Sequence, residues 1–346
     1  MRAIWITKAG GPDVLEVREG PDPEPRDGEV RVRVRAAGLN FAEIMARKGL
    51  YPDAPKRPSV VGYEVAGDID AVGDGVPERP GARVGDRVAA LVRFGGHADV
   101  VCVPADQCFE MPSAMSYAEG AALPVNYLTA YHMLFEIRRV RPGEAILVHQ
   151  AAGGVGTAVL QLCRTVPDVV TFGTASGGKH DYVREHGCDH PIDYRSTDYA
   201  AEVRRLTADR VGGPGVDLVL DALGGPDWRK GYDLLRSTGT LIAFGWANMS
   251  GGERRSFARA AGQIARMPIL TLPTLMNDNR ALAGVNMGHL WHMIPLLQRE
   301  GDALMKLYAE GKIRPHVDAS FAFAQASDAH RYLEHGQSVG KVILTP

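Results

Sequence analysis

The chain has few cysteines and no long hydrophobic run. Only four of its 346 residues are cysteine, and no two of them form a Cys-x-x-Cys pair. This pattern excludes a disulfide framework and indicates a reducing compartment. No run of about 18 apolar residues is present, and Met1 leads into a predicted strand and not a signal peptide. We therefore expect a cytoplasmic protein with no integral membrane segment.

An excess of charge of either sign is also missing. The 39 basic residues nearly balance the 41 acidic ones, which leaves a net charge of −2. This balance argues against a nucleic-acid partner, which requires a basic surface. The hydrophobic content of 45% and the charged content of 23% are typical of a globular protein. The length is sufficient for two domains.

Two regions of the chain differ in pattern. Residues 1–123 contain short β-like segments separated by Gly and Pro, and Val30–Arg35 alternates between valine and arginine. This predicts a mainly antiparallel, barrel-like domain. From Pro124, apolar strands alternate with helical segments, which predicts βαβ units around a parallel sheet. We expect an α/β protein with one domain at residues 1–123, completed by about 300–346, and a second at 124–299.

A glycine-rich turn lies between a buried strand and a helix start. The sequence Ala-Ile-Leu-Val-His-Gln from Ala145 is followed by Ala-Ala-Gly-Gly-Val-Gly, which ends at Gly156. The helix N-terminus favours a pyrophosphate, and Gly153 would let the backbone approach it. Ala151 replaces the first glycine of the dinucleotide pattern, so a glycine turn in an unrelated α/β protein is the alternative.

The next strand, Val169–Phe172, predicts which dinucleotide is bound. An NAD-binding unit carries Asp or Glu after this strand for the ribose 2′-hydroxyl, and none is present here. Thr174, Ser176 and Lys179 instead offer two hydroxyls and a cation to a 2′-phosphate. The prediction is NADPH; the alternative is an ordinary turn with a solvated lysine.

Residues 246–290 are predicted to form an insert. A helix is expected from Glu253 to Arg266, and Arg254, Arg255 and Arg259 could form a basic rim for a thioester substrate or simply a solvated face. The apolar stretch Pro268–Met276 favours core or subunit packing, with a lipid-facing role as the alternative.

Seven segments together resemble one enzyme family across nearly the whole chain. They resemble the zinc-independent quinone oxidoreductases of the medium-chain dehydrogenase/reductase superfamily, and within these the vesicle amine transport protein branch. The segments are Ala37–Glu43, Lys48–Pro52, Leu123–Tyr131, Val148–Gly156, Phe172–Ser176, His190–Tyr194 and Val339–Leu344. The resemblance implies a GroES-like catalytic domain and a Rossmann-type, doubly wound parallel-sheet domain that holds NADPH.

The chain differs from the wider superfamily in one respect. Zinc-containing alcohol dehydrogenases of this fold place cysteine and histidine ligands where this chain has Asn40 and Tyr63. Amide and phenol side chains do not form a tetrahedral zinc site, so no metal is expected. Without a Lewis acid, we expect the substrate to delocalise the incoming charge itself, as a quinone or conjugated carbonyl does.

The resemblance implies a role for each site residue. Asn40 and Tyr51 are the expected catalytic residues, which polarise the substrate oxygen or relay a proton; solvent is an equally good proton source. A turn cap for Asn40 and a packing aromatic for Tyr51 are the alternatives. Asn126 and Thr129 are expected near the nicotinamide, with helix capping as the alternative for Asn126.

The other expected cofactor contacts follow the same resemblance. The pyrophosphate is assigned to Gly153, Gly154 and Val155, and the 2′-phosphate to Thr174, Ser176, Lys179 and Tyr194. The remaining contacts are Leu223, Phe244, Gly245, Asn286 and Lys341.

The predicted function is NADPH-dependent, zinc-independent reduction of a small-molecule quinone or related conjugated carbonyl. One alternative is an enoyl, 2-alkenal or enoyl-thioester reductase with the same cofactor. The other is a nucleotide-binding protein with little turnover. The resemblance also implies a homodimer through edge strands near Leu282–Met287.

Overall fold

The computed structural model describes residues 1–252 and 256–346 and divides the chain into two compact units. Unit 1 combines Met1–Leu128 with Met287–Pro346, and unit 2 combines Thr129–Gly251 with Ser256–Asn286. The sequence boundaries at 123 and about 300 therefore lie several residues from those of the structure. Helical periodicity begins at Pro124, but packing decides the boundary, which falls inside helix α3 (Pro124–Tyr131).

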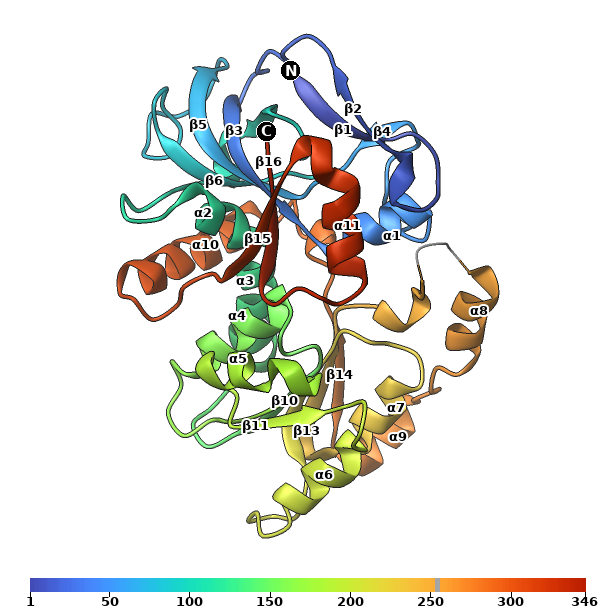
Figure 1. Cartoon of the computed structure of the whole chain (residues 1–346). Helices are drawn as coiled ribbons and strands as arrows, with labels where there is room; N and C mark the ends of the chain where they lie inside the picture. Colours follow the sequence, from blue (N-terminus) through green and yellow to red (C-terminus); the bar gives the residue numbers. More distant parts are fainter. Residues whose placement is uncertain (253–255) are drawn as a thin grey trace. The chain divides into compact units, whose positions relative to one another are not determined.

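Unit 1 is built around a seven-stranded sheet. Its order is β15-β16-β3-β5-β6-β8, and β7 pairs with β3. The strands are β3 (Glu29–Leu39), β5 (Glu64–Val72), β6 (Arg87–Leu91), β7 (Val100–Pro104), β8 (Cys108–Glu110), β15 (Val317–Ala322) and β16 (Lys341–Thr345). Figure 1 shows β3, β5 and β6 side by side. A second, three-stranded sheet joins β1 (Arg2–Ile6), β2 (Leu15–Glu19) and β4 (Ser59–Val60).

The alternation of valine and arginine in β3 buries the valines on one face of the sheet, as expected. Val30, Val32 and Val34 are at most 4% exposed and belong to the core of unit 1. The intervening arginines lie on the other face, where Arg31 pairs with Asp70 at 2.8 Å. A strand with period-two hydrophobicity buries one face and hydrates the other. The mainly antiparallel first domain is therefore confirmed.

Helices close the ends of the unit 1 sheet. They are α1 (Phe41–Lys48), α2 (Tyr117–Ala122), α10 (Ile294–Ala309) and α11 (Ala326–Glu334), together with the start of α3. The last helix, α11, packs against α1, β15 and β16. The C-terminal part of the chain thus contributes both strands and helices to unit 1.

Unit 2 contains a six-stranded parallel sheet of Rossmann type. Its order is β11-β10-β9-β12-β13-β14, with every pair parallel. The strands are β9 (Ala145–Val148), β10 (Val170–Ala175), β11 (His190–Asp193), β12 (Val216–Asp221), β13 (Leu235–Ala243) and β14 (Ala281–Gly284). The connecting helices are α4 (Gly154–Cys163), α5 (His180–Glu185), α6 (Tyr199–Leu206) and α7 (Asp227–Tyr232). The strand order reverses between β9 and β12, where this fold binds its ligand.

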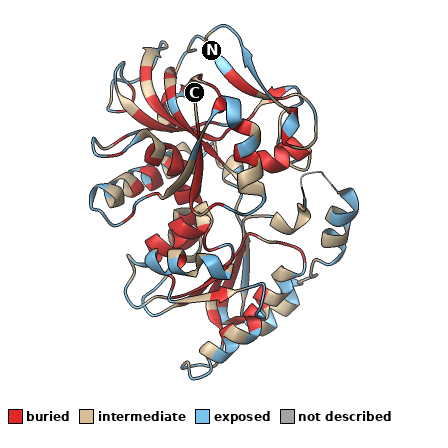
Figure 2. Cartoon of the chain, in the orientation of Figure 1, coloured by how far each residue is buried: buried red, intermediate tan, exposed pale blue. Residues whose placement is uncertain are grey.

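The 246–290 segment is only partly an insert. It contains α8 (Phe257–Ala265) and α9 (Leu272–Asp278), and it ends with β14, the sixth strand of the sheet. The first residues of the helix expected from Glu253 lie outside the described residues. Leu270 and Leu275 pack on the unit 2 core, whereas Ile269 is 91% exposed. Figure 2 shows the contrast between the buried strands and the exposed surface of α8.

No helix of the described residues is both long enough and apolar enough to cross a membrane.

The packing of α10 generates a test of the unit 1 core. A Cβ at Gly301 would lie 2.0 Å from the Cε1 atom of the buried Phe109 ring. Gly301→Ala is expected to lower the free energy of unfolding by about 1–3 kcal/mol because the overlap forces a shift of helix or ring. Urea denaturation measures the change.

Gly262→Ala is the matched control in α8. Its Cβ would meet no atom within 4 Å. Alanine is the better helix former, so this variant should gain about 0.5–1 kcal/mol. Equal effects of the two substitutions would contradict the packing described for α10.

Candidate functional site

Most of the predicted cofactor residues lie at one edge of the unit 2 sheet. They follow successive strands of that sheet, at the carboxyl ends, and because the strands are parallel these ends share one edge. Strand β9 is followed by Gly153, Gly154 and Val155, and β10 contains Thr174 near its end and is followed by Ser176 and Lys179. The residue after β11 is Tyr194, and β12 is followed by Leu223. After β13 come Phe244 and Gly245, and after β14 comes Asn286.

The glycine-rich turn closes tightly onto α4. The Gly153 N–H donates to the Gln150 carbonyl at 2.8 Å, and Gln150 adopts a positive φ of 53°. A Cβ at Gly156 would lie 2.4 Å from the Gln150 carbonyl oxygen, so only glycine permits this approach. The first N–H groups of α4, from Gly154 and Val155, have no partner within the helix. This end of α4 is therefore suited to an anionic ligand.

Thr174, which was expected to contact the 2′-phosphate, is buried in the structure. Its side chain is 3% exposed, and its Oγ1 lies 3.1 Å from His149 Nδ1 and accepts the Gln150 N–H at 3.3 Å. The strand places this hydroxyl below the edge of the sheet, where it is already hydrogen-bonded. Ser176 is half-buried. Lys179 is also half-buried and ends a short 3-10 helix.

An acidic residue that the sequence reasoning missed lies beside this turn. Asp193 is the last residue of β11, and a Cβ at Gly177 would lie 3.0 Å from its Oδ2. The backbone N–H of Arg195 donates to Asp193 Oδ1 at 2.9 Å, and this bond lowers the pKa of the carboxyl. Asp193 is at the end of the neighbouring strand and not of β10, so only the strand pairing brings it here.

The remaining predicted residues of this edge differ in exposure. Tyr194 is 53% exposed, with the Arg195 guanidinium 5.9 Å from its ring centroid. Leu223 and Phe244 are half-buried. A Cβ at Gly245 would lie 2.7 Å from the Ala222 carbonyl oxygen, so glycine allows β12 and β13 to end close together. Asn286 is exposed, two residues beyond β14.

In unit 1, the expected catalytic Asn40 belongs to a buried polar cluster. Lys341 donates to the Asn40 Oδ1 at 2.6 Å and also forms an ion pair with Glu64. Asn40 Nδ2 donates to Glu64 at 3.0 Å and to Glu43 at 3.4 Å. Both amide hydrogens and the carbonyl oxygen of Asn40 are thus engaged. The Asn40 side chain is thus held within the cluster, and Lys341, which was expected to contact the cofactor, is 3% exposed.

The cluster joins four elements of unit 1. Glu43 accepts the Asn40 backbone N–H at 2.7 Å and forms the capping box of α1. Glu64, at the start of β5, accepts the Val125 N–H of α3 at 2.7 Å. A Cβ at Gly38 would lie 2.5 Å from the Glu64 Oε1, so glycine is required where β3 passes the carboxylate. Asn40 is the N-cap residue of α1, but its side chain makes no capping hydrogen bond to the helix.

Two glutamates share the single lysine of this cluster. Burial raises the pKa of Glu43 from 4.5 to about 8, against the opposing effect of Lys341, and Glu64 adds to the rise. His97 lies nearby with its Nε2 3.1 Å from the Gly38 carbonyl, and burial lowers its pKa to about 4. One uncompensated carboxylate in a fully buried site is costly, so Glu43 holds a proton at neutral pH.

Tyr51 lies among aromatic residues. Its ring meets Tyr63 edge to face with centroids 6.3 Å apart, and Tyr63 packs on Phe94 at 5.3 Å. Tyr51 packs against the small apolar cluster of Ile6 and its neighbours and is half-buried. Burial is the main cause that raises the pKa of the Tyr63 phenol, with Glu43 adding to it.

The residues expected near the nicotinamide are buried in α3. Asn126 is 5% exposed, and its Nδ2 donates to the Ala122 carbonyl at 3.5 Å. It is the third residue of α3, so it is not the N-cap. Thr129 is 7% exposed and begins unit 2.

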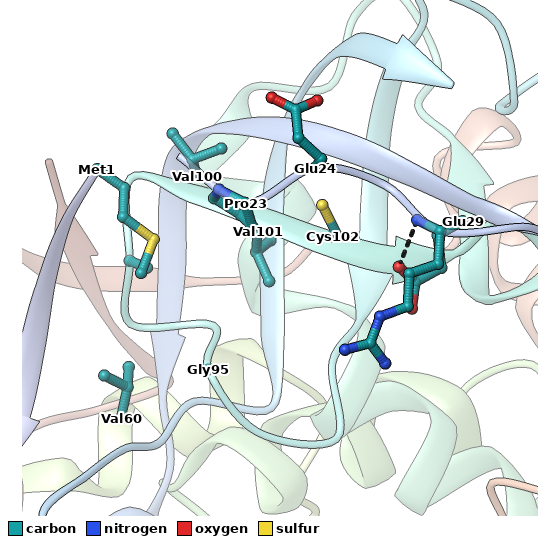
Figure 3. A pocket seen from close by; sticks show the side chains of 11 residues that line it. Met1, Pro23, Glu24, Glu29, Val60, Gly95, Val100, Val101 and Cys102 are labelled. Carbon is teal, nitrogen blue, oxygen red and sulfur yellow. Dashed lines mark hydrogen bonds between the residues drawn. The ribbon is translucent and has the colours of Figure 1, made fainter. Parts of the chain in front are cut away.

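An open pocket of about 350 Å³ lies on unit 1. It is lined by Cys102, Met1, Val60 and Val100, among others (Figure 3). Burial raises the pKa of the Cys102 thiol to about 11, so it is not an activated nucleophile. None of the predicted site residues lines this pocket. Among residues 1–252 and 256–346, no group of three or more His, Cys, Asp or Glu side chains is placed to hold a metal ion.

Comparisons with known families and proteins agree over the whole chain. The family model described as alcohol dehydrogenase GroES-like domain matches residues 26–113, and the one described as zinc-binding dehydrogenase matches residues 186–344. The synaptic vesicle membrane protein VAT-1 homolog of Danio rerio is 45% identical over 347 residues, which cover 99% of this chain and 70% of that protein. A quinone oxidoreductase of Pseudomonas aeruginosa is 34% identical, with 100% and 99% covered.

Solved structures with the same architecture include three informative ones. The human VAT-1 homolog-like protein has a TM-score of 0.85 at 36% identity and covers 100% of this chain and 98% of its own. The Escherichia coli quinone oxidoreductase complexed with NADPH has a TM-score of 0.86 at 27% identity, with 100% of both chains covered. The CurK enoyl reductase has a TM-score of 0.84 at 25% identity and covers 99% and 98%.

The buried Glu43 generates a pH prediction. Its pKa is about 8 in the folded chain against 4.5 as the ordinary value. Between these two values the folded state holds a proton that the unfolded state has lost. This contribution to stability is complete below about pH 4.5 and is lost as the pH rises through 8, by up to about 1.4 kcal/mol per pH unit.

Urea denaturation of wild type and Glu43→Gln at pH 5, 6.5 and 8 measures this contribution. The variant should lack the decline, because glutamine does not titrate. Glu310→Gln is the control, since exposed Glu310 pairs with Lys312 at 2.8 Å, which lowers its pKa. Parallel pH profiles for wild type and Glu43→Gln would show that Glu43 is ionised throughout this range.

Proposed function

The chain belongs to the medium-chain dehydrogenase/reductase family, in the branch of the VAT-1 homologues, and we propose that it is an NADPH-dependent reductase acting on a quinone or related conjugated carbonyl. The observation that carries this proposal is the glycine-rich turn at the N-terminus of α4, at the point where the strand order of the parallel sheet reverses. The NADPH-bound structure of a quinone oxidoreductase with the same fold supports it.

The residues present at this edge fit a phosphorylated dinucleotide. The N–H groups of Gly154 and Val155 would receive the pyrophosphate, and glycine at 153 leaves the approach open. The Ser176 hydroxyl and the Lys179 ammonium would receive the 2′-phosphate through charge-assisted hydrogen bonds. When bound, NADPH supplies the hydride; the protein's part is to bind, orient and exclude water.

We propose that the reaction needs no zinc. The two positions that carry cysteine and histidine ligands in zinc-containing members hold Asn40 and Tyr63 here. The Asn40 amide is engaged by Lys341, Glu64 and Glu43, and the Tyr63 ring packs between Tyr51 and Phe94. A quinone or conjugated carbonyl suits such a site because it spreads the incoming negative charge over its own π system.

Tyr51 is our proposal for the residue that meets the substrate oxygen. Asn40 was expected to share this role. Because its amide is already engaged by Lys341, Glu64 and Glu43, we propose instead that it positions the start of α1. The Tyr51 hydroxyl would donate its proton to the developing oxyanion and regain one from solvent. Direct protonation of the product by solvent is the alternative.

Two further functions have specific support. An enoyl-thioester or 2-alkenal reductase would use the same cofactor, and the CurK enoyl reductase has the same architecture. A nucleotide-binding protein with little turnover is supported by relatives named as vesicle membrane proteins. Of the arginines considered as a thioester rim, Arg254 and Arg255 lie outside the described residues, and Arg259 donates to the Asn248 carbonyl at 3.0 Å.

We also propose a cytoplasmic homodimer. Among the residues that the structure describes, β14 pairs with β13 alone, so its other edge has no strand partner there, and Leu282 on this strand is 39% exposed. A second copy added across this edge would continue the sheet and cover the apolar side chains. The molar mass in solution tests the dimer.

All four cysteines are free thiols, which agrees with a reducing compartment.

Anaerobic oxidation of NADPH with a panel of quinones and enones tests the activity. Turnover of 1,4-benzoquinone or naphthoquinones, unchanged by a zinc chelator, is the expected result. Turnover of enones alone would favour the enoyl-reductase function. Tight NADPH binding without turnover of either class would favour the binding protein.

Tyr51→Phe tests the proton donor in the same assay. It should lower kcat at least about tenfold without changing the NADPH affinity, because only the hydroxyl is removed. Tyr332→Phe is the control in unit 1, since its hydroxyl donates to Asp318 at 2.7 Å. An unchanged kcat for Tyr51→Phe would assign the proton to solvent.

Lys179→Ala tests the 2′-phosphate site. Loss of one charge-assisted contact should weaken NADPH about 10- to 100-fold and leave NADH nearly unchanged, as measured by nucleotide fluorescence. Lys312→Ala, remote in the sequence and paired with Glu310, should change neither. Equal losses of affinity for both nucleotides would contradict the assignment of Lys179 to the 2′-phosphate. Asp193 would then be the candidate for contact with the ribose.

A further inference from the structure

A line of buried polar groups crosses three neighbouring strands of unit 2. Thr174 is the penultimate residue of β10, His149 follows β9 directly, and Asp221 ends β12; in the sheet, β9 lies between the other two. The three side chains are 3%, 1% and 0% exposed. They lie beneath the edge at which the proposed function places the dinucleotide, and none of them has a role in that proposal.

The two outer members of the line, Thr174 and Asp221, each accept hydrogen bonds from a turn at this edge. Thr174 Oγ1 accepts the Gln150 N–H at 3.3 Å, at the start of the glycine-rich turn. Asp221 Oδ1 accepts the N–H groups of Leu223 and Gly224 at 2.7 and 2.8 Å, which shapes the turn after β12. His149 lies between them, with Nδ1 3.1 Å from Thr174 Oγ1 and Nε2 3.9 Å from Asp221 Oδ2.

One arrangement of protons satisfies the groups of this line, and it is the one that we adopt in the proposal. Because Thr174 Oγ1 accepts from the backbone, its own proton can be donated to His149 Nδ1. The neutral ring then carries its proton on Nε2, which faces the Asp221 carboxylate. Neither Nε2 nor Oδ2 has a hydrogen-bond partner in the structure, so each is the nearest complementary group for the other.

The surrounding groups hold the imidazole in place. The Tyr199 ring of α6 meets it edge to face at 4.8 Å, and the Tyr199 hydroxyl donates to Asp227 of α7 at 2.9 Å. Lys230, also of α7, lies 4.0 Å from the Tyr199 ring centroid. Burial lowers the pKa of His149, while Asp221 and Asp227 oppose this effect and Lys230 adds to it.

We propose that Thr174, His149 and Asp221 act as one positioning unit, which sets the shape of the turns after β9 and β12 and thereby the affinity for the dinucleotide. This inference rests on the proposed function. It assigns Thr174 a role through the backbone turns, which both NADPH and NADH would contact, and not through the 2′-phosphate. The three residues are positioning residues and touch no reacting atom.

The first test is nucleotide selectivity. Thr174→Val removes the hydroxyl that joins Gln150 to His149 at nearly constant volume. We expect NADPH and NADH to weaken by the same factor, about tenfold, in fluorescence titrations. A loss confined to NADPH would show direct contact with the 2′-phosphate, and no loss for either nucleotide would show that the hydroxyl sets no turn. Both outcomes overturn the proposal.

Thr171→Val is the matched control on the same strand. Thr171 is 1% exposed, and its hydroxyl donates to the Gly187 carbonyl at 2.8 Å, away from the three residues. We expect a comparable loss of thermal stability with unchanged affinity for both nucleotides. Equal weakening of binding in the two variants would attribute the effect to general destabilisation and overturn the proposal.

The second test is a double-mutant cycle. Asp221→Asn keeps an oxygen for the Leu223 and Gly224 N–H groups but turns an N–H toward His149. Thr174 and Asp221 do not touch each other, so independent roles predict multiplied losses, whereas a single unit predicts a double variant at least about threefold tighter than the product. Multiplied losses would overturn the proposal.

A nitrogen NMR measurement of His149 gives a readout that does not depend on binding. We expect the neutral Nε2–H tautomer in the wild type and a shift to Nδ1–H in Asp221→Asn. An Nδ1–H tautomer in the wild type would contradict the arrangement. Failure of the wild type to bind either nucleotide would overturn the proposed function itself, whereas binding without the coupled losses would overturn this inference alone.

Discussion

The ion pair between Glu64 and Lys341 is the interaction on which unit 1 depends most. It joins the starts of β5 and β16, and through Glu64 and Asn40 it also holds the N-termini of α3 and α1. Both charged groups are almost completely buried. Removing one partner of such a pair costs about 3–5 kcal/mol because the other charge remains desolvated. Residues 301 positions apart, Asn40 and Lys341, are thereby fixed in one place.

The same cluster constrains what chemistry unit 1 can perform. The two positions that carry zinc ligands in other members of the family are occupied by an amide with no spare hydrogen-bonding group and by an aromatic ring. A protonated glutamate and a salt-bridged glutamate surround the amide. Under the proposed function, charge stabilisation would fall to the substrate and to the side chain that reaches its oxygen. This would link the absent cysteine and histidine to the quinone-like substrate that we propose.

In unit 2, the structure depends on the turns at the carboxyl edge of the sheet, as unit 1 depends on its buried ion pair. Gly156 and Gly245 let backbone segments approach more closely than any side chain would allow. Buried side chains beneath them satisfy the backbone N–H groups that these turns leave unpaired, as Asp221 does for Leu223 and Gly224. The surface offered to a dinucleotide is thus mostly backbone, and its shape depends on residues that would never contact the ligand.

The sequence by itself determined the two folds, because period-two valines in β3 and alternating strands and helices after Pro124 report burial directly. It also located the glycine-rich turn, whose residues are contiguous. It did not determine where side chains such as Thr174, Lys341 and Asn40 point. Those directions depend on partners distant in the chain: His149 across the sheet for Thr174, and Glu64 for the other two. Only the tertiary structure decided them, because a buried polar group adopts the orientation in which its hydrogen bonds are satisfied.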